Sequence, residues 1–585
     1  MTIKNRFTTS LLVATLVFGT LNGWAQQDSV KLRQEVEVSK NYQPSILEVD
    51  KINDIPKIKA EQTDPPTFDY SIFSKPVYGT FDLTPVAAAK MVGEPRPEME
   101  NGLLKLGLGN YLTTYGELFY NAEPDKNSNF GMHFRHLASS AKVSLLNDDI
   151  VKAPEADHVA EIFGQKFFKR STLSGSLAFK RKAFKYYGYP GDRLSDAEKN
   201  QMIEYFGDRQ HFSQGIADVR LKSGKTYGAN INYDLGFNYH YLITKTDQKE
   251  NQALFSVDLS KKFDQLTGLL HTSLTYYLAD GIRNRFTSTV GEKQQVLLKI
   301  NPSVRWNTEN ANLQLGLYTS MLFDDDTTAL MVLYPKVKAE WSPVQNVLTL
   351  FAGIDGYLQH NTYSAIAEEN PYADPFHDVE NARFAYILSA GLKGKLTSKT
   401  NYVTGVSYSL VKDHHFYYLE SANRSNPNAS PHYLNNTFSV LYDDVKVLKL
   451  SAEVLHSVSD NFSLRLATNY YSYELEEQAK AWQMPGLDVV FSGIYKATEQ
   501  LNFNADIFFV GTRTALISEP FNSSVPSTQV EMDPIIDLNV GAGYQLSERL
   551  NLFAKFNNFG FQKYEQWHGY TNKGFNFLAG ISYSF

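Results

Sequence analysis

The last eleven residues, Phe575–Phe585, alternate between two kinds of side chain. Every second residue is apolar, ending in Tyr583 and Phe585, and the residues between them are mostly small or polar. A period of two places alternate side chains on opposite faces of a β-strand. About ten residues is also the length with which a tilted strand crosses a lipid bilayer. The sequence therefore predicts a membrane-crossing strand at the end of the chain.

Short polar stretches upstream are each followed by residues of alternating hydrophobicity, which is the pattern of a β-hairpin. These stretches are Lys222–Thr226, Asp264–Gln265, Asn307–Asn310, Pro343–Asn346, Thr397–Thr400, Ser459–Asn461, Thr498–Gln500 and Ser547–Arg549. The longer connections between them are residues 184–211, 281–292, 359–382, 514–533 and 560–574. Short turns at one end and long loops at the other are typical of a membrane barrel. We therefore predict an all-β fold, a large antiparallel transmembrane up-and-down β-barrel over residues 101–585.

Segmentation of this region gives about 24 strands, within a range of roughly 22–26. Three segments decide the count, namely 78–84, 101–109 and 414–422. For short turns and long loops to alternate along the chain, Phe416–Ser421 has to be a strand of its own. A barrel of this size encloses a wide lumen. Its short turns and its C-terminus lie on the periplasmic side, and its long loops are external.

The composition supports strands that face lipid on one side and water on the other. The chain has 38 Phe and 36 Tyr, yet its mean hydropathy is −0.34. No stretch approaches 18 uncharged apolar residues, which excludes helical membrane spans. The absence of Cys excludes disulfides, thiol catalysis and Cys-ligated metals. A formal net charge of −7 argues against nucleic acid as a partner.

The start of the chain has the pattern of a secretory signal peptide over residues 1–25. Lys4 and Arg6 precede the apolar stretch Leu11–Leu21, and small residues end at Ala25. The apolar stretch is too short for a membrane anchor, which needs roughly 20 residues. Residues 26–100 are charged and interrupted by prolines. They predict an extended periplasmic arm or a partial plug rather than a compact domain.

The C-terminal strands carry a family resemblance. Ile536–Tyr544, the Asn-rich segment Leu550–Gly560 and the closing strand resemble the end of TonB-dependent receptors. The resemblance covers roughly the last 55 residues closely and the rest of the barrel only in architecture. It implies a barrel near 22 strands in the outer membrane of a Gram-negative bacterium. It also implies that Tyr583 and Phe585 form an assembly signal for the barrel assembly machinery. The region before the barrel is shorter than the plug domain of such receptors.

A short segment of the arm, Glu35, Val36, Glu37, Val38 and Ser39, resembles the TonB box of the same family. There the segment is handed as a strand to a periplasmic energising protein, and any solvated strand can have a similar sequence. The physical basis of such binding is β-augmentation, in which backbone pairing supplies the affinity.

No group of polar residues rises above background as a catalytic or metal site. Adjacent strand residues point to opposite faces, so a turn is favoured over a metal site for His414 and His415. Asp324–Asp326 lacks the spaced ligands of a Ca²⁺ loop and is interpreted as a solvated external turn. Glu474, Glu476 and Glu477 are interpreted as part of a loop mouth. We predict no enzyme activity, no cofactor and no metal.

Two tyrosine clusters, Tyr186–Tyr189 and Tyr470–Tyr473, lie near predicted strand ends. They could be stacking platforms for sugars in an external vestibule. The alternative is that they belong to the aromatic girdles of a membrane barrel, and we favour the girdle.

Two functions fit this barrel, and a third possibility, a soluble secreted all-β protein, conflicts with the alternating turns. The first is a receptor-like protein that binds or takes up a nutrient across the outer membrane. Its partners would be outer-membrane lipid, a periplasmic energising protein or a surface lipoprotein. The alternative is a non-transporting barrel subunit of a larger outer-membrane assembly or secretion complex. The sequence indicates no ligand.

Overall fold

The computed structural model of the protein describes residues 100–585, apart from residues 126, 190–194, 198–199, 201–208, 225–230, 284–289, 325–328, 376–378, 421–435 and 519–526. The predicted signal peptide, the arm up to residue 99 and the segment 78–84 lie outside the described residues. In the part that is described, no helix is long and apolar enough to cross a membrane.

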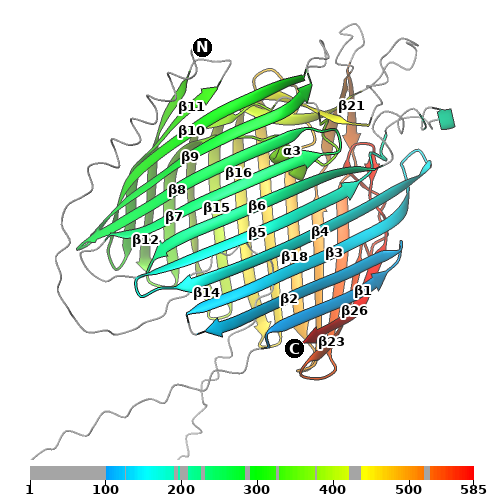
Figure 1. Cartoon of the computed structure of the whole chain (residues 1–585), viewed down its shortest axis with the longest axis horizontal. Coiled ribbons are helices and arrows are strands. Elements are labelled where there is room, and N and C mark those ends of the chain that lie inside the picture. Colours follow the sequence, from blue (N-terminus) through cyan, green and yellow to red (C-terminus); the bar gives the residue numbers. More distant parts are fainter. Residues whose placement is uncertain are drawn as a thin grey trace, which may run out of the picture. The chain divides into compact units, whose positions relative to one another are not determined.

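The described strands form a closed antiparallel barrel of 22 strands (Figure 1). Each wall strand pairs with the next along the chain, and the last pairs with the first. The wall strands are β1 Gly102–Gly109, β2 Thr113–Asp125, β3 Ser128–Ser144, β4 Ile150–Phe167, β5 Ser171–Phe184, β6 Gln210–Ser223, β7 Asn232–Thr244, β8 Lys249–Phe263, β9 Leu266–Arg283, β10 Val290–Asn307, β11 Ala311–Asp324, β12 Leu330–Val344, β13 Leu348–Gln359, β14 Ala382–Thr397, β15 Thr400–Glu420, β16 Phe438–Ser459, β17 Phe462–Leu475, β18 Leu487–Lys496, β19 Leu501–Val510, β22 Ile535–Gln545, β23 Leu550–Asn557 and β26 Asn576–Ser584.

The other elements belong to the external connections. β20 (Arg513–Ser518) and β21 (Thr528–Met532) pair with each other, and β20 adds in parallel to the end of β15. β24 (Glu565–Trp567) and β25 (Tyr570–Thr571) form a small hairpin before the last strand. Helix α3 (Tyr363–Glu369) lies between β13 and β14.

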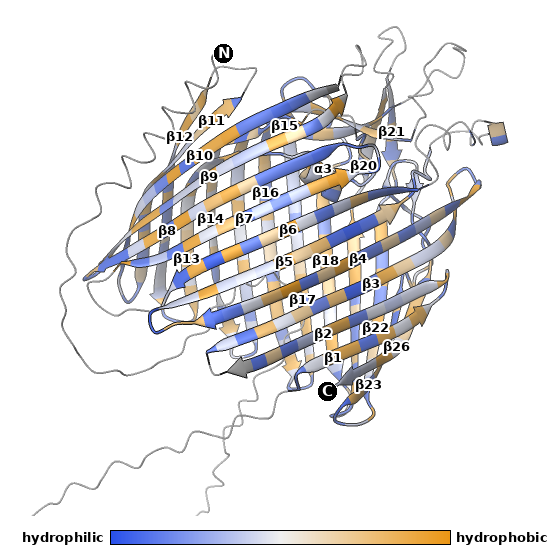
Figure 2. Ribbon diagram, in the orientation of Figure 1, coloured by the Kyte–Doolittle hydropathy of each residue, from blue (hydrophilic) through white to orange (hydrophobic). Residues whose placement is uncertain are grey.

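Side chains alternate between a lipid-facing outside and a polar inside. On β26, the outward residues Phe577, Ile581, Tyr583 and Phe585 are 39–43% exposed, whereas inward-facing Ser582 is 8% exposed. Inward-facing residues elsewhere form ion pairs such as Arg465–Glu453, at 2.8 Å between Nε and Oε1. Figure 2 shows apolar and polar residues alternating along the strands. The apolar outside is what a bilayer requires of a barrel.

The chain ends at the seam of the barrel, as the alternation in Phe575–Phe585 predicts. β26 pairs with both β23 and β1. Phe585 exchanges two backbone hydrogen bonds with Gly102, at 2.7 and 3.0 Å. Both termini of the barrel therefore lie at the end with the short turns, which confirms the predicted direction of the strands.

The predicted strand count is confirmed at its lower bound, and one strand assignment is wrong. Segment 101–109 is a strand, β1, but Phe416–Ser421 is not a strand of its own. Phe416–Glu420 is the end of β15, which continues through a bulge between Val411 and His414, and Ser421 lies outside the described residues. The extra residue, with Asp413 at φ 57°, interrupts the period of two. The predicted loop 514–533 also contains β20 and β21 rather than coil.

We expect Gly580→Val to prevent closure of the barrel. Gly580 lies on β26 between β23 and β1, and a Cβ there would clash with the backbone carbonyl oxygen of Leu106. Unheated samples of the variant should lose the faster-migrating, heat-modifiable band on gels. Ala579→Val, whose side chain points to lipid, is the matched control and should keep this band. A folded band in both variants would contradict the seam.

Candidate functional site

External connections meet in an apolar cluster over the lumen, here called the mouth core. It combines the connection after β5, the α3 connection and the last connection with the external ends of β5–β7, β15 and β16. Its buried members are Phe184, Tyr186, Phe212, Leu242, Tyr363, Ile366, Ala367, Ala373, Val379, Tyr417, Leu419, Phe438, Val440 and Tyr570. Figure 1 shows α3 at the opposite end of the barrel from the C-terminus. The mouth core thus lies on the external side.

A carboxylate from the barrel wall holds the start of α3. Thr362 caps the helix, accepting a hydrogen bond from the amide of Ala365 at 3.1 Å. Glu250 on β8 accepts hydrogen bonds from the amides of Tyr363 and Ser364, at 2.6 and 2.9 Å. The first amides of a helix have no partner within the helix, so Glu250 supplies partners that the connection itself lacks. Glu250 is 1% exposed.

The end of α3 is tied to a different part of the wall. His415 Nε2 and the Tyr417 hydroxyl, both on β15, contact Glu369 Oε2 at 2.8 and 3.0 Å. Burial alone would raise the pKa of Glu369, but the contacts with His415 and Tyr417 outweigh it and lower this pKa. β8 and β15 are seven strands apart in the wall. Helix α3 therefore bridges the mouth rather than lining one side of it.

Tyrosines join the remaining loops across the mouth. Tyr372 in the α3 connection stacks on Tyr570 in the last connection, with ring centroids 3.6 Å apart. The Tyr187 hydroxyl donates to the carbonyl of Thr571 at 2.9 Å, and the Tyr570 hydroxyl donates to the carbonyl of Asn436. Burial raises the pKa of Tyr187 to about 12, so its hydroxyl stays a donor. Three loop segments thus contribute rings to one aromatic cluster, and a fourth is joined to it through the carbonyl of Asn436.

Arg513 on β20 fixes the last connection to the rim. Its guanidinium donates to the carbonyls of Glu565 and Gln566. The Glu565 side chain accepts hydrogen bonds from the Gly569 amide, at 2.9 Å, and from His568, at 3.0 Å between Nδ1 and Oε2. These contacts are internal to the β24–β25 hairpin, so they shape the loop that presents Tyr570.

The girdle interpretation is wrong for Tyr186–Tyr189. Tyr186 and Tyr189 are 7% and 3% exposed and pack among the external loops, away from the lipid-facing surface. Tyr470 fits the girdle, since it is 47% exposed on the outward face. Tyr473, on the opposite face of β17, packs against the neighbouring apolar cluster that contains Trp482. The position of a tyrosine near a predicted strand end therefore does not distinguish burial under the external loops from exposure in the girdle.

The turn predicted at His414 and His415 is also wrong. Both residues lie within β15, directly after its bulge, and their ring centroids are 5.3 Å apart. His415 is used by the contact with Glu369 described above. Among the described residues, no group of three His, Asp or Glu side chains is placed to hold a metal ion.

The predicted acidic segments lie at external strand ends. Glu474 forms an ion pair with Lys446 at 2.6 Å, and Glu476 and Glu477 follow directly after β17. Asp324 ends β11, and the rest of Asp324–Asp326 lies outside the described residues.

The remaining predicted site residues divide between the seam and the arm. Tyr583 on β26 and Phe585 directly after it stack on the outward side of the wall, with ring centroids 6.2 Å apart. Their role as an assembly signal stays a prediction, as does the TonB-box role of Glu35–Ser39, which lies outside the described residues.

Comparisons with known proteins support the architecture. Neither a family model nor a curated protein matches this sequence. Solved structures match over most of the chain. The FrpB iron transporter from Neisseria meningitidis aligns with a TM-score of 0.62 at 10% identity, covering 83% of this chain and 81% of that one. The pyoverdine receptor FpvA from Pseudomonas aeruginosa PAO1 has a TM-score of 0.60 at 12% identity, with 83% and 79% covered. The copper transporter OprC has a TM-score of 0.60 at 11% identity, with 83% and 80% covered.

The protein shares its barrel fold with these outer-membrane proteins. This confirms, for the fold, the resemblance seen in the C-terminal strands. Together with the apolar outward surface, the 22-strand barrel is that of an outer-membrane protein.

We expect Glu250→Ala to release the start of α3. Hydrogen bonds to a charged group contribute about 1.5–3 kcal/mol each, so amide hydrogen exchange across Tyr363–Glu369 should accelerate roughly 10-fold or more. Gln252→Ala, on the same face of β8 two residues along, is the control and should leave exchange unchanged. Equal exchange in both variants would show that Glu250 does not hold the helix.

Acidification should loosen the other end of α3. The pKa of Glu369 is lowered in the folded protein. Its contribution is therefore present above the ordinary Glu pKa of about 4.3 and is lost as pH falls through the lower folded value. Solvent screens this carboxylate, which is 41% exposed, so the contribution is at most about 1 kcal/mol. Amide exchange is intrinsically slower at lower pH, so the quantity to compare is the protection factor, the ratio of the intrinsic to the measured exchange rate. This factor should fall at residues 366–374 on acidification in the wild type, and the fall should be smaller in Glu369→Gln.

Proposed function

We propose that the protein is a gated outer-membrane receptor that takes up a nutrient, and that the mouth core is its external lid. The observation that carries this proposal is that α3 is held by Glu250 on β8 and by His415 and Tyr417 on β15. A helix fixed to both sides of a wide opening restricts passage through it. The similarity in fold to an iron transporter, a pyoverdine receptor and a copper transporter supports transport rather than catalysis.

Opening the lid requires exchange of its contacts for contacts with a ligand. The two amide bonds to Glu250 and the Glu369 contacts are discrete polar links, whereas the tyrosine stack is an apolar contact area. A ligand shifts such an equilibrium only by its difference in affinity for the two states. A lid that is closed 99% of the time needs roughly 5.5 kcal/mol of differential binding to become 99% open. A ligand that recognises several of these aromatic rings could supply this difference.

The periplasmic side of the proposal rests on the arm. Residues Glu35–Ser39 would pair as an added strand with a periplasmic energising protein. A surface lipoprotein could cover the external loops, and Tyr583 with Phe585 would be recognised by the barrel assembly machinery. We expect these partners because the C-terminal strands resemble those of TonB-dependent receptors.

Deletion of residues 30–45 should abolish growth on one nutrient while the barrel stays folded in the outer membrane. The reason is that coupling through Glu35–Ser39 would be lost while the wall strands are untouched. Growth on a panel of single nutrients, with heat-modifiable migration as the folding control, measures this. A second variant that lacks residues 30–33 and 40–45 but keeps residues 34–39 should restore growth. This result would assign the effect to residues 34–39.

Unchanged uptake in the deletion strain, together with stoichiometric co-purification of other envelope proteins, would contradict the receptor. That result would favour the alternative, a non-transporting barrel subunit of a larger outer-membrane assembly or secretion complex.

A further inference from the structure

Three basic side chains lie side by side on the outside of the barrel. His136 on β3 is directly opposite His158 on β4, and His158 is directly opposite Arg181 on β5. The Nδ1 atoms of the two histidines are 3.1 Å apart, so one ring donates a hydrogen bond to the other and at most one of the two is protonated. His136 Nε2 also contacts the Thr114 hydroxyl at 3.0 Å. Arg181 is exposed, forms no ion pair with the described residues, and lies close enough to His158 and His211 to act on both electrostatically. We call these three residues the basic row.

The basic row has no acidic counterpart on its own face. The outward positions of β3, β4 and β5, which alternate with the inward ones, contain no carboxylate. Asp157, next to His158, points inward and pairs with Arg135 at 3.0 Å. Farther out on the same face, Lys142 and Lys152 are directly opposite each other, an arrangement of like charges that is destabilising without an anion. The whole face therefore attracts anions.

The depth of the row coincides with the external edge of the apolar band. On β3 the outward residues Phe130, Met132 and Phe134 precede His136, and on β5 Leu177 and Phe179 precede Arg181. These residues follow the periplasmic turns, and about 9–11 residues of a tilted strand cross the hydrocarbon core. The basic row therefore lies where the phosphates of the external leaflet lie.

An apolar hollow of about 590 Å³ lies directly below the row on the same face. Its floor is made by the small residues Ala160, Gly215 and Ala217, and larger side chains such as Phe134 and Tyr241 border it. A Cβ added at Gly215 would meet no atom within 4 Å, so the space is open. The apolar hollow matches the acyl chain of an acylated phosphate ester, and the basic row matches its phosphate.

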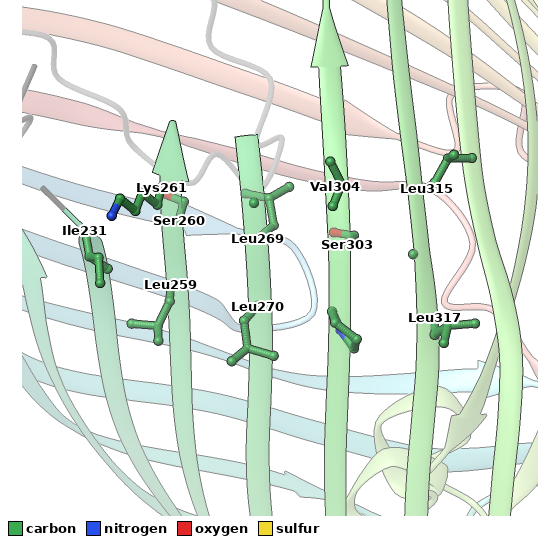
Figure 3. A pocket seen from close by; sticks show the side chains of 13 residues that line it. Ile231, Leu259, Ser260, Lys261, Leu269, Leu270, Ser303, Val304, Leu315 and Leu317 are labelled. Carbon is green, nitrogen blue, oxygen red and sulfur yellow. The ribbon is translucent and has the colours of Figure 1, made fainter. Parts of the chain in front are cut away.

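A second outward hollow provides a contrast (Figure 3). It measures about 570 Å³ and lies near the periplasmic ends of β8–β11, bordered by Leu259, Leu270 and Leu317 among others. Its cation, Lys261, lies over the ring of Phe263 at 5.1 Å. The second hollow therefore has apolar walls but no row of adjacent basic groups.

We propose that the basic row and the hollow beneath it bind a phosphorylated, acylated glycolipid of the external leaflet. Its phosphate would contact Arg181 and the protonated ring of the histidine pair, and one acyl chain would occupy the hollow. Charge-assisted contacts between guanidinium and phosphate are the strong class of hydrogen bond. This site is on the wall and is independent of transport through the mouth.

The test uses the full-length protein in a mild detergent, with lipid A as the probe and dephosphorylated lipid A for comparison. In native mass spectrometry, we expect the wild type to retain lipid A roughly 10-fold better than the dephosphorylated form. The triple variant His136→Ala, His158→Ala, Arg181→Ala should lose this preference. Lys180→Ala with Lys182→Ala, inward-facing on the same strand, should keep it.

Gly215→Leu tests the hollow separately. Because there is open space at this position, the variant should fold normally, as heat-modifiable migration would verify, and it should bind both lipids less well. The proposal is overturned if the folded triple variant retains lipid A as the wild type does. It is also overturned if the wild type does not distinguish the two lipids, or prefers phosphatidylethanolamine to lipid A.

Discussion

The hydrocarbon of a bilayer offers no partner to a backbone amide or carbonyl, so every strand edge that crosses it must be paired. The seam between β1 and β26 meets this requirement, and the backbone of Phe585 is hydrogen-bonded to that of Gly102 at the end of the seam. Closure also fixes the direction of every strand, because both ends of the wall then lie on the same side. The external loops can be long because they are free of this constraint.

Outside the membrane, the loops have to satisfy their own polar groups and bury their own apolar side chains. They do so with partners that are distant in the chain. Glu250 caps a helix more than one hundred residues away, and Tyr570 stacks on Tyr372. The mouth core therefore behaves as a small packed unit on top of the barrel. Its contacts link separate parts of the wall, which is why we interpret it as a lid.

The periodicity of two was sufficient to predict the barrel, its orientation and its closing strand, since these depend on local alternation. It failed at β15, where one extra residue near Asp413 reverses the alternation. The mouth core could not be predicted, because Glu250 is an ordinary inward residue until α3 is placed above it. Tyr186–Tyr189 resembled a girdle for the same reason: burial by a distant loop leaves no local pattern. The outward row of His136, His158 and Arg181 could be recognised only from the pairing register of β3, β4 and β5, which the sequence does not give.

The central claim is that α3 is held in one position across the mouth. Because the chain has no Cys, spin labels can be attached uniquely at Glu368→Cys in α3 and Lys245→Cys after β7, both exposed positions. Pulsed electron paramagnetic resonance on the full-length protein in outer-membrane vesicles then measures the distance between them. The account predicts a single narrow distance distribution that broadens in a Glu250→Ala background. A broad distribution in the otherwise unaltered protein would contradict the lid.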